Sequence, residues 1–264
     1  MLSIRDLNIT FLQYERGLRR RVTHPVDHLN LNIDSGELVA VVGASGSGKS
    51  LLAHAVLGIL PYNATVSGSI RYGGEELTKE RAAGLRGKEI CLVPQGVSWL
   101  DPLMRVGNQL ENGRKELGRR EPGRREKSLE ALKSCGLEET VAERYPHQLS
   151  GGMARRVLLA TAVMEHPRLV IADEPTPGLP PHRARSVMER LRKMAEDGAA
   201  VMLITHDVEL ALAFCHRIAV MHDGTVVEEA AAEEFADWQR LRHPYARQLS
   251  RALPQNDFFG GEGR

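Results

Sequence analysis

A glycine-rich loop in the first fifth of the chain carries the clearest chemistry. Residues 43–50 read Gly-Ala-Ser-Gly-Ser-Gly-Lys-Ser, which fits the pattern GxxxxGK[ST] in full. Small residues let the backbone wrap around phosphate oxygens, and the helix that follows adds the positive end of its dipole. We expect Lys49 to reach the β- and γ-phosphates of a nucleoside triphosphate and the Ser50 hydroxyl to ligate Mg²⁺. The predicted nucleotide-binding residues are Gly43, Ser45, Gly46, Ser47, Gly48, Lys49, Ser50 and Leu51.

An acidic pair after a second apolar segment supplies the other half of this site. Residues 169–172 read Leu-Val-Ile-Ala, and Asp173 and Glu174 follow directly. Asp173 is predicted to bind Mg²⁺, directly or through water, and Glu174 to polarise a water that attacks the γ-phosphate. Acidic residues often follow strands, so the pair is informative because the glycine loop accompanies it. Together they predict hydrolysis of the triphosphate.

The apolar pattern around these residues is that of an α/β nucleotide-binding core. Residues 38–42 are apolar throughout, as expected of a strand buried on both faces of a parallel sheet. Residues 169–172 and 201–204 repeat this short pattern, and helical spacing occurs at 50–60 and 187–194. The order strand, glycine loop, helix therefore places the phosphate-binding residues at the carboxyl end of a buried strand.

Three other regions have different patterns. Residues 2–33 alternate apolar and polar side chains, which is typical of half-exposed antiparallel strands. Residues 75–155 are rich in Glu, Arg, Lys and Leu at helical spacing. Residues 218–221 and 226–227 predict a final strand pair that turns at Asp223-Gly224.

Composition and charge exclude several classes of protein. Of 264 residues, 42% are hydrophobic and 26% charged, the balance of an ordinary globular chain. Thirty-five Lys and Arg against 34 Asp and Glu leave a net charge of +1, which argues against a protein that coats nucleic acid. The three cysteines are far apart, so neither a disulfide framework nor a zinc site is expected. No apolar run reaches the ~18 residues of a membrane span, so any work at a membrane requires a partner that spans it.

Three further motifs appear in a fixed order with the first two. Residues 149–153 read Leu-Ser-Gly-Gly-Met, Gln95 follows an apolar segment, and His206 lies in Ile-Thr-His-Asp. In this order the motifs resemble the ATP-binding-cassette (ABC) family, over roughly residues 1–230. The resemblance implies an α/β P-loop NTPase (RecA-like) core with an antiparallel β-subdomain and an α-helical signature subdomain at about 96–155.

The resemblance also assigns roles to residues beyond the phosphate loop. Ser150, Gly151 and Gly152 open a helix and are expected to cradle the γ-phosphate of an ATP held by a second cassette, which implies a head-to-tail dimer. His206 is expected to contact the γ-phosphate and orient the catalytic carboxylate, and Gln95 to sense the metal and couple the site to the helical subdomain. The implied catalytic residues are Glu174, His206 and Gln95, and the implied Mg²⁺ ligands are Ser50, Gln95 and Asp173.

The adenine ring is expected to stack on an aromatic side chain of the first strand pair. Phe11 is the first choice and Tyr14 the second. Either ring could instead belong to the core.

A narrower resemblance is to the oligopeptide, dipeptide and nickel importer branch of the family. It rests on residues 46–50, on Leu-Gly-Ile-Leu-Pro at 57–61, on Met153 ending the signature, and on His-Pro-Tyr-Ala-Arg at 243–247. The last of these lies in a C-terminal extension of that branch, here residues 231–264. Some members hold an iron–sulfur cluster there with cysteines. This chain has no cysteine after Cys215, so no cluster is expected.

The branch implies partners and a location as well. The expected partners are a second ABC ATPase subunit, two transmembrane permease subunits and, indirectly, an extracytoplasmic substrate-binding protein, with no nucleic acid. The chain is expected at the cytoplasmic face of the inner membrane. Nickel, metal–metallophore complexes and oligopeptides all remain open as cargo.

Two other functions are alternatives to an importer ATPase. A soluble ABC-type ATPase of DNA repair inserts a long coiled coil or a zinc module, whereas only about a hundred residues separate Ser50 from Ser150 here. A small-molecule kinase would leave the signature and His206 unexplained. The soluble ABC-type ATPase, in DNA repair or another non-transport role, stays the alternative to an importer.

One position departs from the family pattern. After Glu174 the family typically reads Pro-Thr-Ser/Thr-Ala-Leu-Asp, but this chain reads Pro-Thr-Pro-Gly-Leu-Pro, so Pro180 replaces the aspartate that crosses the dimer interface. Proline offers neither a carboxylate nor an N–H and fixes φ. Two readings stay open, an asymmetric heterodimer with unequal ATP sites or a rigid loop that merely alters turnover.

Overall fold

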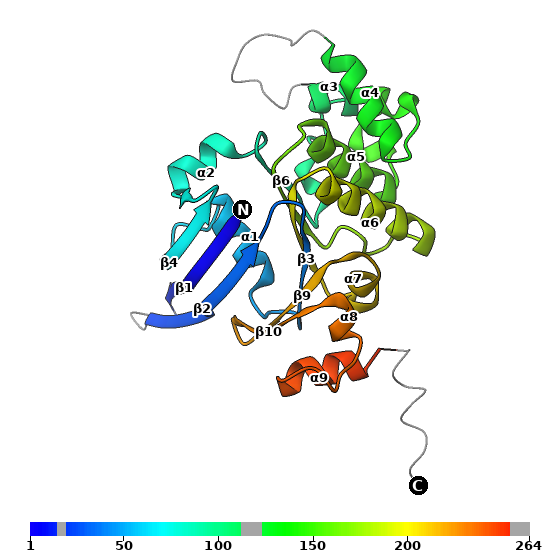
Figure 1. Cartoon of the computed structure of the whole chain (residues 1–264). Coiled ribbons are helices and arrows are strands. Elements are labelled where there is room, and N and C mark those ends of the chain that lie inside the picture. The colour runs from blue at the N-terminus through cyan, green and yellow to red at the C-terminus, as the bar shows by residue number, and fades with distance from the viewer. Residues whose placement is uncertain (15–19, 112–122, 254–264) are drawn as a thin grey trace.

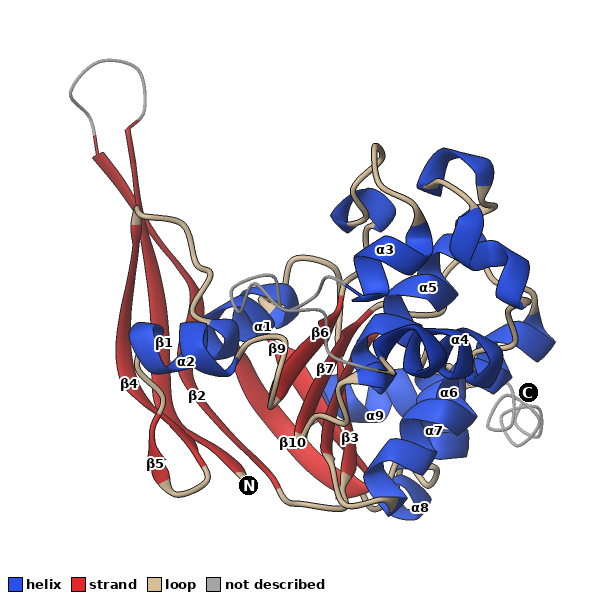
Figure 2. Cartoon of the chain, turned by 90° about the horizontal axis from the view of Figure 1, so that it is seen from above, coloured by secondary structure: helices blue, strands red, loops and turns tan. Residues whose placement is uncertain are grey.

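The computed structural model describes residues 1–14, 20–111 and 123–253. In them a six-stranded sheet occupies the centre of the chain, with an antiparallel sheet on one side and helices on the other (Figure 2). Its strands, in the order in which they lie, are β10 (Thr225–Ala231), β9 (Arg217–His222), β3 (Leu38–Val42), β8 (Ala200–Thr205), β7 (Leu169–Asp173) and β6 (Ile90–Val93).

The central sheet is parallel except at β10, as the short apolar segments predict. β3 pairs in parallel with both β8 and β9, so its carboxyl end lies beside theirs. β9 and β10 form a hairpin in which Asp223 and Gly224 have φ of 45° and 84°, the left-handed backbone of a two-residue turn. The predicted strand pair and its turn are therefore confirmed.

Successive residues of β3 belong to two different cores. Leu38, Ala40 and Val42 pack in the core under the helices, whereas Val39 and Val41 pack in the core under the antiparallel sheet. This follows from the two-residue repeat of a strand, whose side chains alternate between the faces. All five are completely buried, which is why the segment carries no polar residue.

The antiparallel sheet forms the outer layer, and helices α1 and α2 lie between it and the central sheet (Figure 2). Alternating side chains of β1 and β2 face inward and are buried, including Ile4, Leu7, Leu29 and Leu31. Two of its strands, β4 and β5, were not predicted. The elements are β1 (Leu2–Tyr14), β2 (Arg20–Ile33), β4 (Ala64–Tyr72), β5 (Glu75–Glu76), α1 (Lys49–Leu57) and α2 (Lys79–Leu85).

Helices cover the other face of the central sheet and extend beyond its β6 edge (Figure 1). The amphipathic α6 buries Val187, Leu191 and Met194, which confirms the helix predicted from their spacing. Among the described residues no helix combines the length and the apolar character needed to cross a bilayer. The helices are α3 (Val106–Glu111), α4 (Arg124–Ser134), α5 (Gly151–Met164), α6 (Pro181–Glu196), α7 (Val208–Phe214), α8 (Ala232–Phe235) and α9 (Pro244–Arg251), with 3₁₀ turns at Val97–Trp99, Glu139–Glu143 and Pro146–Gln148.

Candidate nucleotide site

The phosphate loop, residues 43–48, joins the carboxyl end of β3 to the start of α1, as predicted. Gly43 lies against the backbone of β9, where a Cβ would stand 2.1 Å from the carbonyl oxygen of Met221. Gly48 precedes α1 with φ 99°, and a Cβ there would stand 2.5 Å from the carbonyl oxygen of Pro25. Only glycine fits these two positions, so neighbouring strands hold both ends of the loop in place.

Lys49 lies under this loop and is buried. Its Nζ donates hydrogen bonds to the carbonyl oxygens of Gly43 at 2.8 Å and of Ala44 at 2.7 Å. Burial lowers the pKa of Lys49, and the carboxylates of Glu174 and Asp173 oppose that shift. The ammonium group is thus held at the centre of the loop, as the phosphate-binding prediction requires.

Asp173 ends β7 and is buried beside the start of α1. Burial raises its pKa, and a hydrogen bond with the Ser50 hydroxyl opposes the rise. In the part of the chain that the structure describes, Asp173 Oδ1 and Glu174 Oε2 are buried without a hydrogen-bond partner. Mg²⁺ in nucleotide sites is held by one or two protein oxygens together with phosphates and waters. The hydroxyl of Ser50 and the free oxygen of Asp173 therefore fit such an ion.

Glu174 and His206 are brought together from the ends of two adjacent strands. The carboxylate Oε1 of Glu174 lies 2.8 Å from Nδ1 of His206. Glu174 adopts φ 47°, uncommon for a residue with a side chain, and its N–H donates to the carbonyl of Ile204 at 2.9 Å. The Glu174 side chain is 11% exposed and that of His206 69%, so the pair joins a buried carboxylate to an accessible ring.

Two predicted site residues are not drawn into this cluster. Gln95 follows β6 and is exposed, and within the described chain no hydrogen bond joins it to Ser50 or Asp173. Phe11 lies in β1 opposite Thr23 and is half buried against the core under the antiparallel sheet. The side chain of Tyr14, the second choice for adenine, lies outside the described part of the structure. The roles of Gln95 and Phe11 stay predictions.

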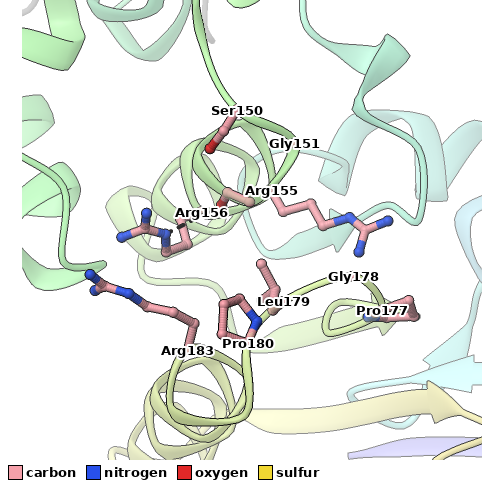
Figure 3. A pocket seen from close by; sticks show the side chains of 10 residues that line it. Ser150, Gly151, Arg155, Arg156, Pro177, Gly178, Leu179, Pro180 and Arg183 are labelled. Atoms are coloured by element: carbon pink, nitrogen blue, oxygen red, sulfur yellow. Dashed lines mark hydrogen bonds between the residues drawn. The ribbon is translucent and has the colours of Figure 1, made fainter.

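The signature loop, residues 149–153, lies at the start of α5 in the helical region. The Ser150 side chain caps this helix by accepting a hydrogen bond from the N–H of Met153 at 3.2 Å. A cavity of about 460 Å³ is lined by residues 150–152 of this loop and by residues 177–180, which precede α6 (Figure 3). The rest of its lining comes from Arg155, Arg156 and Arg183, and no residue of the phosphate loop takes part.

Arginines make this cavity cationic, a feature that sequence reasoning missed. The guanidinium groups of Arg156 and Arg183 lie on one side of it, and that of Arg155 lies on the other (Figure 3). Desolvation first, and then the charge of Arg183, lower the pKa of Arg156. The sequence shows that α5 and α6 each carry arginines. It does not show that arginines of the two helices line one cavity.

Comparisons with known proteins agree with this geometry. Residues 26–177 match the family described as "ABC transporter". The chain is 36% identical over 239 residues to the oligopeptide transport ATP-binding protein OppD of Lactococcus lactis subsp. cremoris, covering 86% of this chain and 69% of that protein. It is 34% identical over 258 residues to the dipeptide transport ATP-binding protein DppD of Escherichia coli, covering 94% and 78%.

Solved structures give the same result for the fold. A bacterial ABC transporter cassette, MJ0796, described as dimeric, superposes with a TM-score of 0.77 at 31% identity, over 88% of this chain and 99% of that one. A post-hydrolysis form of the same cassette, bound to ADP and Pi, superposes equally well at 30% identity. The predicted P-loop NTPase fold is thus confirmed, and the chain belongs to the ABC transporter family of ATPases.

Proposed function

We propose that Glu174 and His206 activate the water that hydrolyses ATP. The observation that carries this proposal is the 2.8 Å contact between Glu174 Oε1 and His206 Nδ1, which leaves Glu174 Oε2 buried and unpaired. A carboxylate held by one oxygen can accept a proton from water with the other. Mg²⁺ bound by Ser50, Asp173 and Gln95 would offset phosphate charge, while Lys49 binds the β- and γ-phosphates.

We further propose that the signature loop binds the triphosphate held by a second cassette. The cavity beside Ser150 is cationic and shares no lining residue with the chain's own phosphate loop. The N-terminus of α5 and three arginines attract phosphate oxygens. In this proposal the phosphate belongs to a nucleotide that is bound by the facing subunit. The dimeric description of the MJ0796 cassette supports this arrangement.

Pro180 is proposed to make the two ATP sites of the dimer differ. It occupies the position before α6, with Pro181 as the first residue of the helix, and its side chain makes no capping hydrogen bond. The carboxylate that the family places there is therefore missing from the dimer interface. A heterodimer with a sibling that retains the aspartate would have one standard and one altered site, whereas in a homodimer both sites would change alike.

For the whole assembly we propose an importer. The names of the relatives, oligopeptide transport for OppD and dipeptide transport for DppD, favour peptides as cargo. Nickel and metal–metallophore complexes have no such support. In this proposal residues 1–230 form the ATPase, residues 231–264 an extension without an iron–sulfur cluster, and two permease subunits hold the chain at the cytoplasmic face of the inner membrane. A substrate-binding protein delivers cargo from the other side.

Reconstitution tests this proposal directly. The tagged full chain is co-expressed with candidate permeases and a sibling ATPase, and the purified complex is placed in liposomes with its substrate-binding protein. We expect ATPase activity to rise with dipeptides or oligopeptides and not with Ni²⁺. A rise with Ni²⁺ alone would overturn the peptide assignment, and a chain that assembles with no permease would overturn the importer.

A further inference from the structure

The described part of the C-terminal extension, residues 231–253, is anchored to the ATPase core through α8 and α9 (Figure 1). Phe235 of α8 is completely buried, and its carbonyl oxygen accepts a hydrogen bond from the buried Ser250 hydroxyl of α9 at 2.7 Å. The carboxylate of Glu228 in β10 accepts from the backbone N–H groups of Arg242 and His243, both at 2.7 Å. These contacts fix the start of α9 relative to the central sheet.

The first residues of α9 direct one tyrosine toward the nucleotide site. His243 is the capping residue, and its Nδ1 accepts a hydrogen bond from the N–H of Tyr245 at 3.3 Å. Pro244 takes the first helical position, where a missing N–H costs nothing. The ring of Tyr245 then stacks on that of His222, the last residue of β9, with centroids 4.0 Å apart and planes at 17°.

The hydroxyl of Tyr245 reaches the phosphate loop itself. It accepts a hydrogen bond from the N–H of Ala44 at 2.9 Å, across 201 positions of sequence. This N–H belongs to the same peptide unit as the carbonyl of Gly43, which accepts from Lys49 Nζ. One peptide plane is therefore held by Tyr245 at its N–H and by the phosphate-binding lysine at its C=O. Rotation of that plane would disturb both contacts together.

We propose that Tyr245 is a positioning residue for the nucleotide site, through which the C-terminal extension holds the rim of the phosphate loop in its ATP-binding form. The loop binds phosphate with backbone N–H groups and Lys49, so its affinity depends on how well their directions are fixed before ATP arrives. Gly43 and Gly48 are already held by β9 and β2. Tyr245 holds the exposed outer side of the loop, at the N–H of Ala44.

The test compares Tyr245→Phe with Tyr62→Phe in the full chain. The first variant loses only the hydroxyl and keeps the stacking ring, and the second loses the hydroxyl of a fully exposed tyrosine. Equilibrium titration with MgADP, which is not hydrolysed, gives Kd, and ATP hydrolysis gives KM and kcat. One hydrogen bond predicts a rise in Kd and KM of about two- to tenfold for Tyr245→Phe, with kcat nearly unchanged. Tyr62→Phe should match the parent chain.

The midpoint of the unfolding transition of Tyr245→Phe distinguishes a positioning role of Tyr245 from a purely structural one. Positioning predicts weaker nucleotide binding by a chain that is fully folded at the assay temperature. Unchanged Kd and KM in Tyr245→Phe, with or without a lower midpoint, would overturn the inference, as would a loss confined to kcat. The inference rests on the proposed phosphate site, so Lys49→Ala is titrated alongside. If Lys49→Ala binds MgADP normally, the site assignment fails rather than the role of Tyr245.

Discussion

The phosphate loop and the signature loop are both glycine-containing turns that open a helix, yet their surroundings differ. A side chain at Gly43 would collide with the backbone of β9, and Lys49 is buried beneath the loop. A side chain at Gly151 would meet nothing within 4 Å, and the loop borders a cavity of about 460 Å³. The first loop is completed by its own chain, whereas the second is left open on the side where a partner would bind. The phosphate loop is therefore the more rigidly packed of the two loops before any nucleotide binds.

The largest expected effect is on ATP hydrolysis at the site formed by the phosphate loop, Asp173 and Glu174. Glu174→Gln keeps the size of the side chain and its hydrogen bond to His206 but removes the proton acceptor. We expect kcat to fall about 10²- to 10⁴-fold while MgATP still binds. Steady-state ATPase assays with parallel nucleotide titration measure both. Hydrolysis that persists in this variant would remove Glu174 from its proposed role.

A matched pair of glycine substitutions tests the contrast between the loops. Gly43→Ala forces a Cβ into the Met221 carbonyl, so we expect a loss of about 1–3 kcal/mol in unfolding free energy and weak nucleotide binding. Gly151→Ala has room and a helical position, so stability should stay within about 0.5 kcal/mol. Urea unfolding measures both. The contrast is wrong if the two variants lose equal stability.

The Gly151→Ala variant also distinguishes nucleotide binding by the single chain from ATP hydrolysis by the assembled dimer. Gly151→Ala should bind MgADP with the parent affinity because its own phosphate loop is untouched. ATPase activity of the assembled dimer should nevertheless fall, since the added methyl group lies where a partner's phosphate would approach. Normal activity in the dimer would show that the open loop does not contribute to the partner's site.

The third prediction concerns the buried carboxylate beside the phosphate loop. Burial raises the pKa of Asp173, so the folded chain keeps this proton at pH values where the unfolded chain has lost it. Stability from this group therefore falls as pH rises from the ordinary value of 3.8 through the raised pKa, and the ionised form is unfavourable at neutral pH. Asp173→Asn should stabilise the nucleotide-free chain by about 1–3 kcal/mol at pH 7, while Mg²⁺-dependent hydrolysis is lost.

Unfolding curves at several pH values check this prediction. The gain from Asp173→Asn should shrink as pH falls, because the parent carboxyl becomes protonated there. Asp223→Asn is the control, since that side chain is 88% exposed in a turn that asparagine tolerates. A less stable Asp173→Asn at neutral pH would mean that the buried charge is compensated by Lys49 rather than held at a cost.

The last prediction concerns Pro180, the departure from the family pattern, where two small stability effects oppose each other. Pro180→Asp gives α6 a capping side chain, worth about 0.5–2 kcal/mol, but restores flexibility to the unfolded chain, which costs about 0.4–1 kcal/mol. The net shift should lie between about −0.5 and +1.6 kcal/mol, so changes in ATPase rate report on the dimer interface. An asymmetric heterodimer predicts a changed rate in the assembled transporter, and an unchanged rate would rule the asymmetry out.

Sequence patterns predicted some strands and missed others for a physical reason. The buried strands β3, β7 and β8 are short apolar runs, and water exclusion on both faces demands such runs wherever they occur. β4 has exposed side chains at most of its positions and a glycine, Gly68, with φ 93°, so no alternation marks it. It is defined by backbone pairing with β1, which depends on a partner about 60 residues away.

The phosphate loop, the acidic pair and the order of the motifs were predictable from local sequence, because each motif is a short run of residue types at consecutive positions. The contact of Tyr245 with Ala44 and the arginine-lined cavity beside Ser150 were decided by tertiary structure. Both join segments whose sequences carry no sign of each other, and only the packing of the extension and of α5 against α6 brings them together. Long-range contacts of this kind depend on how whole helices and strands pack against the sheet, and no single segment of the sequence specifies that packing.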